Sequence, residues 1–565
     1  MSMMIGIDLG TSTTEACVFQ DGKPVMILNP EGQVITPSAV GLDEQGNWVA
    51  GARAKAQYLL RPESTAIEVK RKTGTGEPVS LGKAHYSPVE LQSRLLSYIR
   101  ASASEYLGEN IEQAVISVPA YFNDLQRRET ISAGEMAGFS VERILNEPTA
   151  AALSYGLEHL EEESHVLVYD LGGGTFDVTL LEMFDGVLEV KASSGDNQLG
   201  GKDFDQALED ELFRRFRVKH GKDISTDRLA QVRVKEEAEK CKIALSTQDS
   251  FRVLLPAIGT VGGQPVEMDE TITAAQFEEL TRGLLERTHL PIDCVLEDAE
   301  LSEDEIDRII LVGGSTRMPM VSRDISDYLG KEPTLAVNPD FAVAEGAAIM
   351  ASMISGDMDE ESGLVMTDVN PFALGVRASN GFDHDLMSVV IPRNTTIPVT
   401  KTEQYSTYAD FQTQARIEVY QGESRIASHN HYLGEFSVRN IPPKRAGAEK
   451  IDIAFSYDLN GLLRVTATLV STGKEASIEI HMGKGKEEKT DVSGWKDAKD
   501  AKAYRAVIRT AERMLRRDSL PAGMRERLER LAFDLKEAIV LDQLEEAKKI
   551  EDKLNVLLEE ARDEI

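Results

Sequence analysis

Two stretches of sequence decide the fold: Val166-Leu-Val-Tyr-Asp170-Leu-Gly172-Gly173-Gly174-Thr175-Phe-Asp177 and, near the N-terminus, Ile5-Gly-Ile-Asp8-Leu-Gly10-Thr11-Ser12-Thr13-Thr14. Each stretch places an apolar strand before an aspartate, a glycine-containing turn and a hydroxyl side chain. Glycine lets backbone N–H groups approach phosphate oxygens closely, and hydroxyl groups donate further hydrogen bonds. The two copies therefore predict a duplicated fold that binds a polyphosphate from two sides.

The aspartates in these stretches extend the phosphate chemistry. Asp8 and Asp170, at the strand ends, offer hard oxygen ligands for Mg²⁺ or for its bound waters. Asp177 lies where a carboxylate can orient an attacking water. A single Gly-Gly-Gly is more often an ordinary turn, so the prediction depends on the pairing of the two copies. Neither copy has the G-x-x-x-x-G-K-[ST] pattern of a P-loop or the dinucleotide-binding fingerprint.

Composition narrows the class of protein. A chain of 565 residues is too long for one core and predicts about three or four domains. Its net charge of −33 argues against a nucleic-acid partner, because phosphates would repel it. The three cysteines lack metal-ligand spacing and indicate a reducing compartment; Cys17 and Cys241 are expected to be buried. Without a leader or a long apolar run, we expect a cytoplasmic protein with no membrane partner.

The pattern of the sequence changes three times along the chain. Residues 1–357 alternate apolar strands with amphipathic helices, such as Arg128–Ala137 and Arg228–Leu245, and predict an α/β domain. An acidic, glycine-punctuated stretch at 358–368 predicts an interdomain linker. Short alternating segments separated by turn residues at 369–490 predict a β-sandwich. Residues 491–565 have apolar positions at helical spacing and predict a short helical region, with a bundle core at Leu528, Leu531, Leu535, Ile539, Ile550, Leu554 and Leu557.

The order of motifs resembles the DnaK-type seventy-kilodalton heat-shock chaperone family over nearly the whole chain. The motifs are Ile5–Thr11, Val118–Arg127, Asn146-Glu147-Pro148, Asp170–Asp177, Leu199–Asp205, Leu311–Pro319 and Asn394–Pro398. Within the family the chain is most similar to the HscC branch. The features that carry this finer resemblance are Ser193–Asn197, the Thr367-Asp368 ending of the linker, Phe455–Leu463 and a short C-terminal part.

The resemblance implies an actin-like ATPase built as a duplicated ribonuclease-H-like fold, which binds ATP or ADP with Mg²⁺ and K⁺. By family register, the catalytic residues are Lys70, Thr11, Glu147, Asp177 and Thr175. The nucleotide-binding residues are Gly10, Thr11, Ser12, Thr13, Gly172, Gly173, Gly174, Gly200, Gly201, Glu239, Lys242, Ser246, Gly313, Gly314, Arg317 and Asp340. Asp8 and Asp170 hold the metal through its waters.

Two of these assignments have an ordinary alternative. A lysine beside Arg71 and Lys72 is usually part of a solvated basic face, so only the family register makes Lys70 catalytic. Glu239 and Lys242 lie on one face of a helix, where an ion pair within the helix is the simpler interpretation.

The resemblance also makes the β domain a clamp for unfolded or extended peptides. The matching cleft positions are Val376, Ser379, Tyr405, Tyr408, Ala415 and Ile417. In the common family pattern, a methionine and an alanine form an arch over the bound peptide. Here Ser379 and Tyr408 would form it, so the larger side chain would lie on the opposite side of the arch. Ala415 stands where a larger β-branched residue is common, and the pocket should be wider. Tyrosine and alanine are, however, also ordinary residues of a half-buried sheet that binds no ligand.

Communication between the two functions should involve Arg143, Asn146 and Asp368, which by family register meet a J-domain co-chaperone and the docked linker. A nucleotide exchange factor is a further expected partner. Three departures from the family affect these expectations. The segment between Lys70 and Pro88 is short, Thr367 places a polar residue in the linker, and the helical end is too short for a full lid.

Two other functions share the paired phosphate loops. A small-molecule kinase of the actin-like superfamily is the first, and a filament-forming actin-like protein is the second. The β domain and helical end favour the chaperone, because a sugar kinase needs neither. We therefore expect an ATP-dependent chaperone with slow hydrolysis that unfolded peptides stimulate.

Overall fold

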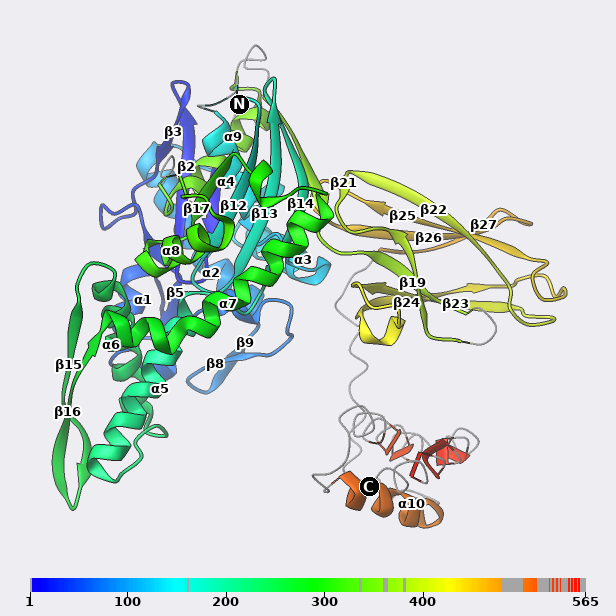
Figure 1. The fold of residues 1–565 in the computed structure, drawn as a ribbon. Helices are drawn as coiled ribbons and strands as arrows, with labels where there is room; N and C mark the ends of the chain where they lie inside the picture. Colours follow the sequence, from blue (N-terminus) through cyan, green and yellow to red (C-terminus); the bar gives the residue numbers. More distant parts are fainter. Residues whose placement is uncertain are drawn as a thin grey trace. The chain divides into compact units, whose positions relative to one another are not determined.

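The computed structural model describes residues 3–157, 159, 162–334, 338–358, 364–379, 383–479 and 501–515, and single helical positions between 528 and 558. The chain divides into two units, Met1–Ile480 and His481–Ile565, and each is described by itself (Figure 1). Among the residues described, no helix combines the length and apolar character needed to cross a bilayer.

The first large sheet contains the N-terminal glycine turn. Its strand order is β11-β10-β1-β2-β3, with β4 paired to β2. Strand β1 pairs parallel with β10 and antiparallel with β2, so the turn after Asp8 connects two neighbouring strands. The strands are β1 (Met4–Leu9), β2 (Thr13–Gln20), β3 (Lys23–Met26), β4 (Thr36–Pro37), β10 (Gln113–Val118) and β11 (Ser140–Asn146).

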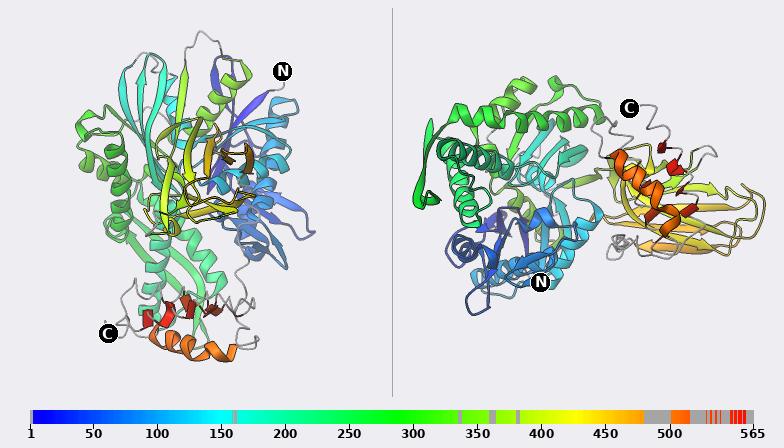
Figure 2. Two further views of the ribbon diagram at one scale, coloured as in Figure 1. Left: turned by 90° about the vertical axis from the view of Figure 1, so that its right-hand side faces the viewer. Right: turned by 90° about the horizontal axis from the view of Figure 1, so that it is seen from below.

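The second large sheet repeats this arrangement around the second glycine turn. Its order is β17-β12-β13-β14-β18-β21, and β12 pairs parallel with β17 and antiparallel with β13. The strands are β12 (Ser164–Leu171), β13 (Phe176–Phe184), β14 (Val187–Asp196), β17 (Arg308–Val312), β18 (Val365–Asn370) and β21 (Thr395–Ile397). The repeated pairing agrees with the predicted duplication, and Figure 2 shows the blue and green halves on opposite sides.

Two helices join the halves. Helices α4 (Glu147–Gly156) and α9 (Ala342–Ser355) contribute to one core with residues of both sheets, including Met4 and Val166. The helices approach closely, because a Cβ at Gly346 would lie 1.7 Å from the Ala150 carbonyl oxygen. Only glycine fits at this crossing, which fixes the position of one half against the other.

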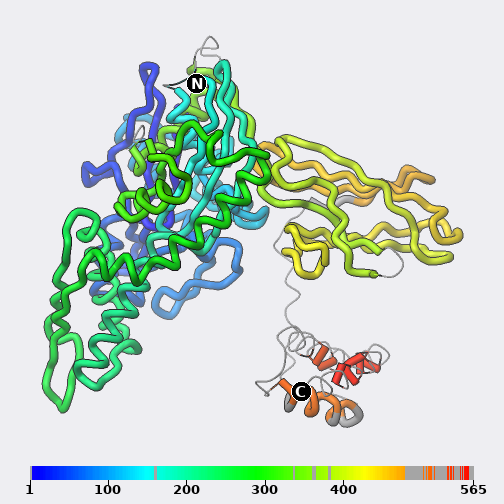
Figure 3. The backbone as a smooth tube through the Cα atoms, in the orientation of Figure 1, coloured from blue at the N-terminus to red at the C-terminus, as the bar shows by residue number. Residues whose placement is uncertain are grey.

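Each half carries outer elements that complete its core. In the first half these are α1 (Gly51–Tyr58), α2 (Pro88–Leu107), α3 (Asp124–Met136), the sheet β6-β5-β7 (Trp48–Ala50, Ala39–Leu42, Thr65–Ile67) and the hairpin β8-β9 (Val79–Leu81, Ala84–Tyr86). In the second half they are α5 (Gly201–His220), α6 (Arg228–Leu245), the hairpin β15-β16 (Ser250–Val261, Gln264–Thr273), α7 (Ala274–Asp298) and α8 (Pro319–Leu329). The β15-β16 hairpin projects from the body (Figure 3).

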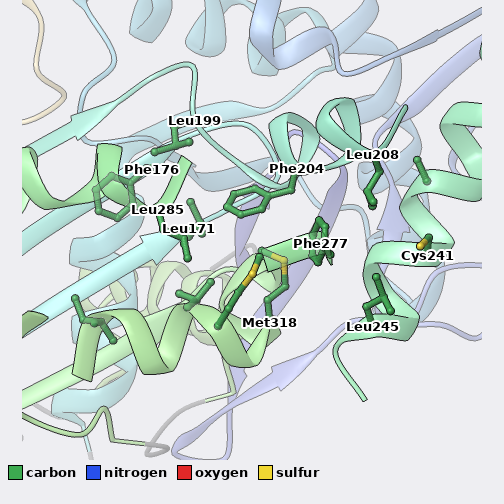
Figure 4. Packing of buried hydrophobic residues seen from close by; sticks show 14 of the residues in the cluster. Leu171, Phe176, Leu199, Phe204, Leu208, Cys241, Leu245, Phe277, Leu285 and Met318 are labelled. Carbon is green, nitrogen blue, oxygen red and sulfur yellow. The ribbon is translucent and has the colours of Figure 1, made fainter. Parts of the chain in front are cut away.

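The core of the second half is dense and aromatic. Phe176 of β13, Phe204 of α5 and Phe277 of α7 are all buried in it (Figure 4). Cys241 lies in the same core, and Cys17 is buried in the first half, so the prediction that these two thiols act as small apolar residues is confirmed. This packing holds α5 and α6 against the sheet that carries the second glycine turn.

The β domain consists of two four-stranded antiparallel sheets, as predicted. The first has the order β20-β19-β23-β24 and the second β22-β25-β26-β27. The strands are β19 (Leu374–Ala378), β20 (Leu386–Ile391), β22 (Val399–Ser406), β23 (Gln414–Gln421), β24 (His431–Arg439), β25 (Lys450–Tyr457), β26 (Leu463–Leu469) and β27 (Lys474–Glu479).

The predicted linker differs from a simple connector. Its last residues form β18, which runs from Val365 to Asn370 and crosses the predicted boundary at residue 368. β18 pairs parallel with β14 and antiparallel with β21 of the β domain. The linker is therefore a strand in the second large sheet, and hydrogen bonds continue from that sheet into the β domain.

The second unit contains α10 (Ala501–Leu515) and further helical positions. Leu528, Leu535, Ile539, Leu554 and Leu557 are buried in one cluster, and Ile550 belongs to it. Leu531 packs against the cluster while partly exposed. The predicted bundle core is thus confirmed at these positions. The predicted boundary between the β-sandwich and the helical region, at residues 490 and 491, lies outside the described residues.

Candidate nucleotide-binding and coupling site

The two glycine turns face each other. A Cβ at Gly173 would lie 2.4 Å from the Ser12 hydroxyl oxygen, and one at Gly174 would lie 2.8 Å from that of Thr11. Gly200 supports the second turn from behind, because its Cβ would lie 2.5 Å from the Gly174 nitrogen. These contacts leave no space for side chains at Gly173, Gly174 and Gly200, so backbone lies against backbone and hydroxyl groups where the two turns meet. This is the geometry that phosphate oxygens require.

A cavity of about 510 Å³ extends from these turns between the two halves. It gathers most of the predicted site residues: Asp8, Gly10, Thr11, Ser12, Thr13, Lys70, Glu147, Asp170, Gly172, Gly173, Thr175, Glu239, Lys242, Ser246, Gly313, Gly314, Arg317 and Asp340. Gly174, Gly200, Gly201 and Asp177 are not in its lining. The three glycines support the second turn and the start of α5, and Asp177 lies buried behind the turn.

An ion pair stands at the closed end of the cavity. The Lys70 Nζ lies 2.5 Å from a carboxylate oxygen of Glu147, and both side chains are buried. Lys70 is only 6% exposed, so the alternative that it belongs to a solvated basic face is wrong. Because a buried charge needs a partner, Glu147 holds the ammonium group in this position.

Three aspartates surround this pair. Asp8 accepts a hydrogen bond of 2.9 Å from the Ser117 hydroxyl, and Asp177 accepts one of 3.1 Å from the Tyr121 N–H. Burial and then the charge of Glu147 raise the pKa of Asp8 and of Asp177, each to about 7. The same two causes, in the same order, raise the pKa of Asp170 well above its usual range. The crowding of carboxylates favours cations at this end of the cavity.

These residues fit a nucleotide-bound magnesium ion. Within the residues that the structure describes, no group of three or more histidine, cysteine, aspartate or glutamate side chains is arranged to hold a metal by itself. Mg²⁺ ordinarily keeps several waters and takes phosphate oxygens, with only one or two carboxylates from the protein. Asp8 and Asp170, which both line the cavity, match this limited requirement.

The far end of the cavity is formed by α6 and the loop after β17. Lys242 lies 2.8 Å from Asp205, and Glu239 lies 3.3 Å from Lys55 and 3.2 Å from Lys202. The ion pair expected within the helix therefore does not form, since each residue pairs with another element. Although burial would raise the pKa of Glu239, the charges of Lys202, Lys55 and Lys242 lower it to about 2.

The loop after β17 brings two further predicted residues to this end. The Arg317 guanidinium pairs with Asp340 at 2.5 Å, and this contact fixes its orientation at the cavity wall. Gly313 has φ +84°, and a Cβ there would lie 2.5 Å from the Leu171 carbonyl oxygen. The close approach of this loop to β12 therefore requires glycine.

Eight lining residues were not predicted: Glu15, Ile35, Ile243, Thr247, Ser315, Met318, Pro339 and Val343. Two carried a signal. Ser315 stands inside the Gly313–Arg317 motif, and its hydroxyl donates to the Gly172 carbonyl at 2.8 Å. Glu15 is a carboxylate in an apolar strand, and burial followed by the charge of Asp8 raises its pKa well above its usual range. The other six are ordinary apolar or loop residues.

The linker strand contacts a residue next to this site. Asp368, in β18, accepts two hydrogen bonds from the Asn146 amide, at 3.0 and 2.9 Å, and it is 6% exposed. Asn146 immediately precedes Glu147, the partner of Lys70. Arg143 makes no side-chain hydrogen bond to Asp368. Burial lowers the pKa of the Arg143 guanidinium, and the charges of Asp368 and Asp458 oppose this shift. Two of the three predicted coupling residues are thus in contact.

The β domain touches the first half through the turn that contains Asn460 and Leu463, which the sequence singled out only as part of the finer family resemblance. The Leu463 N–H donates to Asp124 at 2.9 Å, and Arg128 donates to the Leu463 carbonyl at 3.2 Å. The Ile144 N–H donates to the Asn460 side chain at 3.0 Å. Because two of these contacts use backbone groups of the β26 turn, no side-chain pattern in the sequence could predict them.

The predicted peptide-binding residues lie in both sheets of the β domain. Val376 is buried in β19, and Ala415 and Ile417 lie two residues apart on one face of β23. The Tyr405 hydroxyl is 2.9 Å from that of Ser388, which links β22 to β20. Ser379 lies 2.7 Å from the His384 ring nitrogen.

Tyr408 is 75% exposed at the start of the loop after β22. It therefore has free surface for a ligand, in contrast to the buried Val376. Ser379, which follows β19, is also exposed, whereas Val376, Tyr405, Ala415 and Ile417 are half-buried or buried within the sheets.

Comparison with known proteins gives the family. The sequence matches the family described as Hsp70 protein over residues 4–80 and 75–565. It is 43% identical to the chaperone protein DnaK of Thermotoga neapolitana and 42% identical to those of Thermotoga petrophila and Thermotoga maritima. Each comparison covers 98% of this chain and 95% of the relative. The relatives include the β domain and helical end, which excludes the kinase and filament alternatives. The chain therefore belongs to the Hsp70 family and is an ATP-dependent chaperone.

Proposed function

We propose that ATP hydrolysis at the Lys70–Glu147 end of the cavity controls peptide release from the β domain through the contact between Asn146 and Asp368. The observation that carries this proposal is that single contact. Asp368 belongs to the strand that continues into the β domain, and Asn146 is adjacent in sequence to Glu147. A shift of Glu147 during the reaction would therefore reach the linker through one residue.

Each residue of the closed end has a distinct role in this proposal. Lys70 neutralises charge that develops on the transferred phosphoryl group, and Glu147 orients Lys70. Asp177 orients the attacking water, while Thr11 and Thr175 donate hydrogen bonds to phosphate oxygens. Asp8 and Asp170 hold Mg²⁺ through its waters, and the crowded carboxylates support K⁺ as a second cation.

The other end of the cavity selects the nucleoside. Glu239, Lys242 and Ser246 would bind the ribose and the base edge, and Arg317 would stack on the adenine ring. Lys242 supports this role because it also donates to the Gly201 carbonyl at 3.0 Å, which links α6 to the glycine turn at the start of α5. The adenosine and phosphate ends would then respond to the same movement of the lobes.

The β domain binds unfolded or extended polypeptides in this proposal, through Val376, Ser379, Tyr405, Tyr408, Ala415 and Ile417. Ala415 leaves more room than a β-branched residue would, so bulky apolar side chains are the favoured occupants. We assign residues 1–357 to the ATPase domain, 358–368 to the linker, 369–490 to the clamp and 491–565 to a short lid. The pairing of β18 with β14 and with β21 supports close cooperation between the ATPase domain, the linker and the clamp.

We infer a position in the HscC branch from the Thr367-Asp368 linker ending and the turn at Asn460. A J-domain co-chaperone would contact Arg143 and Asp368, and an exchange factor would open the cavity. A cytoplasmic location agrees with three free cysteines, two of them buried.

The experiment that tests the coupling is an Asp368→Ala variant. We expect its basal ATPase rate to stay within a few-fold of wild type, because Asp368 does not line the cavity. Stimulation by a J-domain protein should fall at least tenfold, since loss of two hydrogen bonds to a charged group is worth about 1.5–3 kcal/mol each. Undiminished stimulation would refute the coupling role, whereas loss of basal activity would place Asp368 in the catalytic site.

A further inference from the structure

A second cavity, of about 370 Å³, lies beside the nucleotide cavity, between α1 of the first half and α6 of the second. It shares Thr11, Ser12 and Glu239 with the nucleotide cavity. The two spaces therefore meet at the first glycine turn, where the phosphates of a nucleotide would lie. Apart from these three shared residues, the roles proposed above do not use the lining of this second cavity.

The walls of the second cavity are mainly apolar and come from both halves. Ala52, Ala56 and Leu59 belong to α1 or follow it, Ile67 comes from β7, and Val232 comes from α6. Tyr58 adds an aromatic ring, and burial raises the pKa of its hydroxyl group. A volume of this size, with apolar walls and one aromatic ring, suits a planar heterocycle.

The rim carries three ammonium groups and three carboxylates, those of Glu68, Glu236 and Glu239. Lys55 and Lys202 both reach Glu239, and Lys235 lies 2.8 Å from Glu68. Lys202 and Lys235 thus stand between the apolar walls and the glycine turns. A polyphosphate that reached this rim would compete with the carboxylates for these ammonium groups, which are long and flexible. The rim therefore offers cationic partners to a phosphate chain that extends beyond the nucleotide cavity.

We propose that the second cavity is a subsite for the second nucleoside of a dinucleoside polyphosphate. One nucleoside and the first phosphates would occupy the nucleotide cavity, the added phosphates would pass Thr11 and Ser12, and the second base would enter the apolar walls beside Tyr58. This inference rests on the proposed nucleotide site. It adds a second ligand class, one that bridges α1 and α6 and so ties the two halves together.

The test compares diadenosine tetraphosphate with ADP, each with Mg²⁺, by calorimetric titration of the full chain. Ala56 is exposed at the mouth of the cavity, so Ala56→Phe fills the space without disturbing a core. Arg53→Phe is the matched control, because Arg53 is exposed on the same helix and does not line the cavity. We expect wild type to bind the tetraphosphate at least tenfold more tightly than ADP, and Ala56→Phe alone to remove this preference.

Each outcome decides the proposal. Equal affinity of wild type for the two ligands, or an unchanged preference in Ala56→Phe, would overturn the subsite while leaving the nucleotide site intact. Equal weakening of both ligands by Ala56→Phe would also overturn it, because the substitution would then act on the nucleotide cavity. Failure of wild type to bind ADP would overturn the proposed nucleotide site and this inference together. A Tyr58→Ala variant, which opens the cavity, should reduce the preference without filling the space.

Discussion

At the scale of single residues, burial decides which charged side chains matter. Lys70 and Lys72 are two residues apart, yet Lys70 is buried against Glu147 whereas Lys72 is exposed. A buried ammonium group costs free energy unless it is paired, so its position indicates a use that an exposed lysine does not have. Sequence alone could not separate these two lysines.

Lys70→Ala should abolish ATP hydrolysis while ATP still binds. The glycine turns and the α6 end of the cavity stay intact, so affinity should change only a few-fold, whereas loss of the cation should slow hydrolysis at least a hundredfold. Single-turnover hydrolysis and a binding titration measure the two effects. Lys72→Ala is the control and should behave as wild type. Hydrolysis by Lys70→Ala within a few-fold of wild type would remove Lys70 from the catalytic role.

Two glutamates on α5 should respond to pH in opposite ways. Burial raises the pKa of Glu209 from 4.5 to about 7, whereas hydrogen bonds from Arg214 lower that of Glu211 to about 2 although burial opposes them. A raised carboxylate pKa makes the folded state lose stability as pH rises from about 4.5 to 7. The lowered pKa of Glu211 gives stability that is present above its ordinary value of 4.5 and is lost as pH falls toward 2.

Glu209→Gln should therefore raise the unfolding temperature of the first transition at pH 8, by the equivalent of about 1–3 kcal/mol, and have little effect at pH 5. Glu211→Gln should lower that temperature at both pH values. Differential scanning fluorimetry of the full chain checks both. A Glu209→Gln variant that is destabilised at pH 8 would show that the ionised carboxylate is needed there.

At the scale of elements, β18 is the critical strand. It pairs with β14 on one side and β21 on the other, so it belongs to both the ATPase sheet and the β domain. Its side chains do not all fit this position well. The Thr367 hydroxyl oxygen is buried and makes no hydrogen bond within the described part of the chain, whereas Leu364 is buried and apolar.

Thr367→Val should hold the linker strand more firmly. The substitution keeps the shape and removes a buried hydroxyl that is not hydrogen-bonded, a group that costs about 1–3 kcal/mol. We expect slower hydrogen exchange at the amides of residues 365–369 in the full chain. Thr402→Val, at an exposed position of β22, is the control and should leave that exchange unchanged. Faster exchange in Thr367→Val would show that the hydroxyl stabilises the docked strand.

Local patterns in the sequence predicted most elements but not their partners. The limits of α6, Arg228–Leu245, agree with the prediction at both ends. Helix α3 begins at Asp124, four residues before the predicted Arg128, because Asn123 and Gln126 form a capping box. The strand character of the linker was missed, since a strand that pairs with distant segments has no local signal.

The candidate site shows the same limit. The alignment of family motifs predicted nearly all the charged residues and glycines that line the cavity. It did not predict that Glu239 pairs with Lys55 and Lys202, because such contacts join segments far apart in sequence. Nor could it find the Leu463 backbone contacts with Asp124 and Arg128, for which any side chain at position 463 would serve.

At the scale of the whole molecule, a short path in the first unit connects the Lys70–Glu147 pair with the linker strand. Lys70 contacts Glu147, Asn146 follows in sequence, and its amide binds Asp368 of the strand shared with the β domain. The turn at Asn460 and Leu463 adds a second attachment between the β domain and the first half. A nucleotide-dependent change in the first path would therefore alter how the β domain is held.

Stopped-flow release of a fluorescent extended peptide tests this account most directly. Wild type loaded with peptide in ADP should release it at least tenfold faster when ATP is added, whereas Asp368→Ala should hydrolyse ATP and release the peptide no faster than in ADP. The two hydrogen bonds of Asp368 to Asn146 are the physical reason for the difference. ATP-accelerated release from Asp368→Ala at the wild-type rate would contradict the central claim that this contact couples the nucleotide site to the clamp.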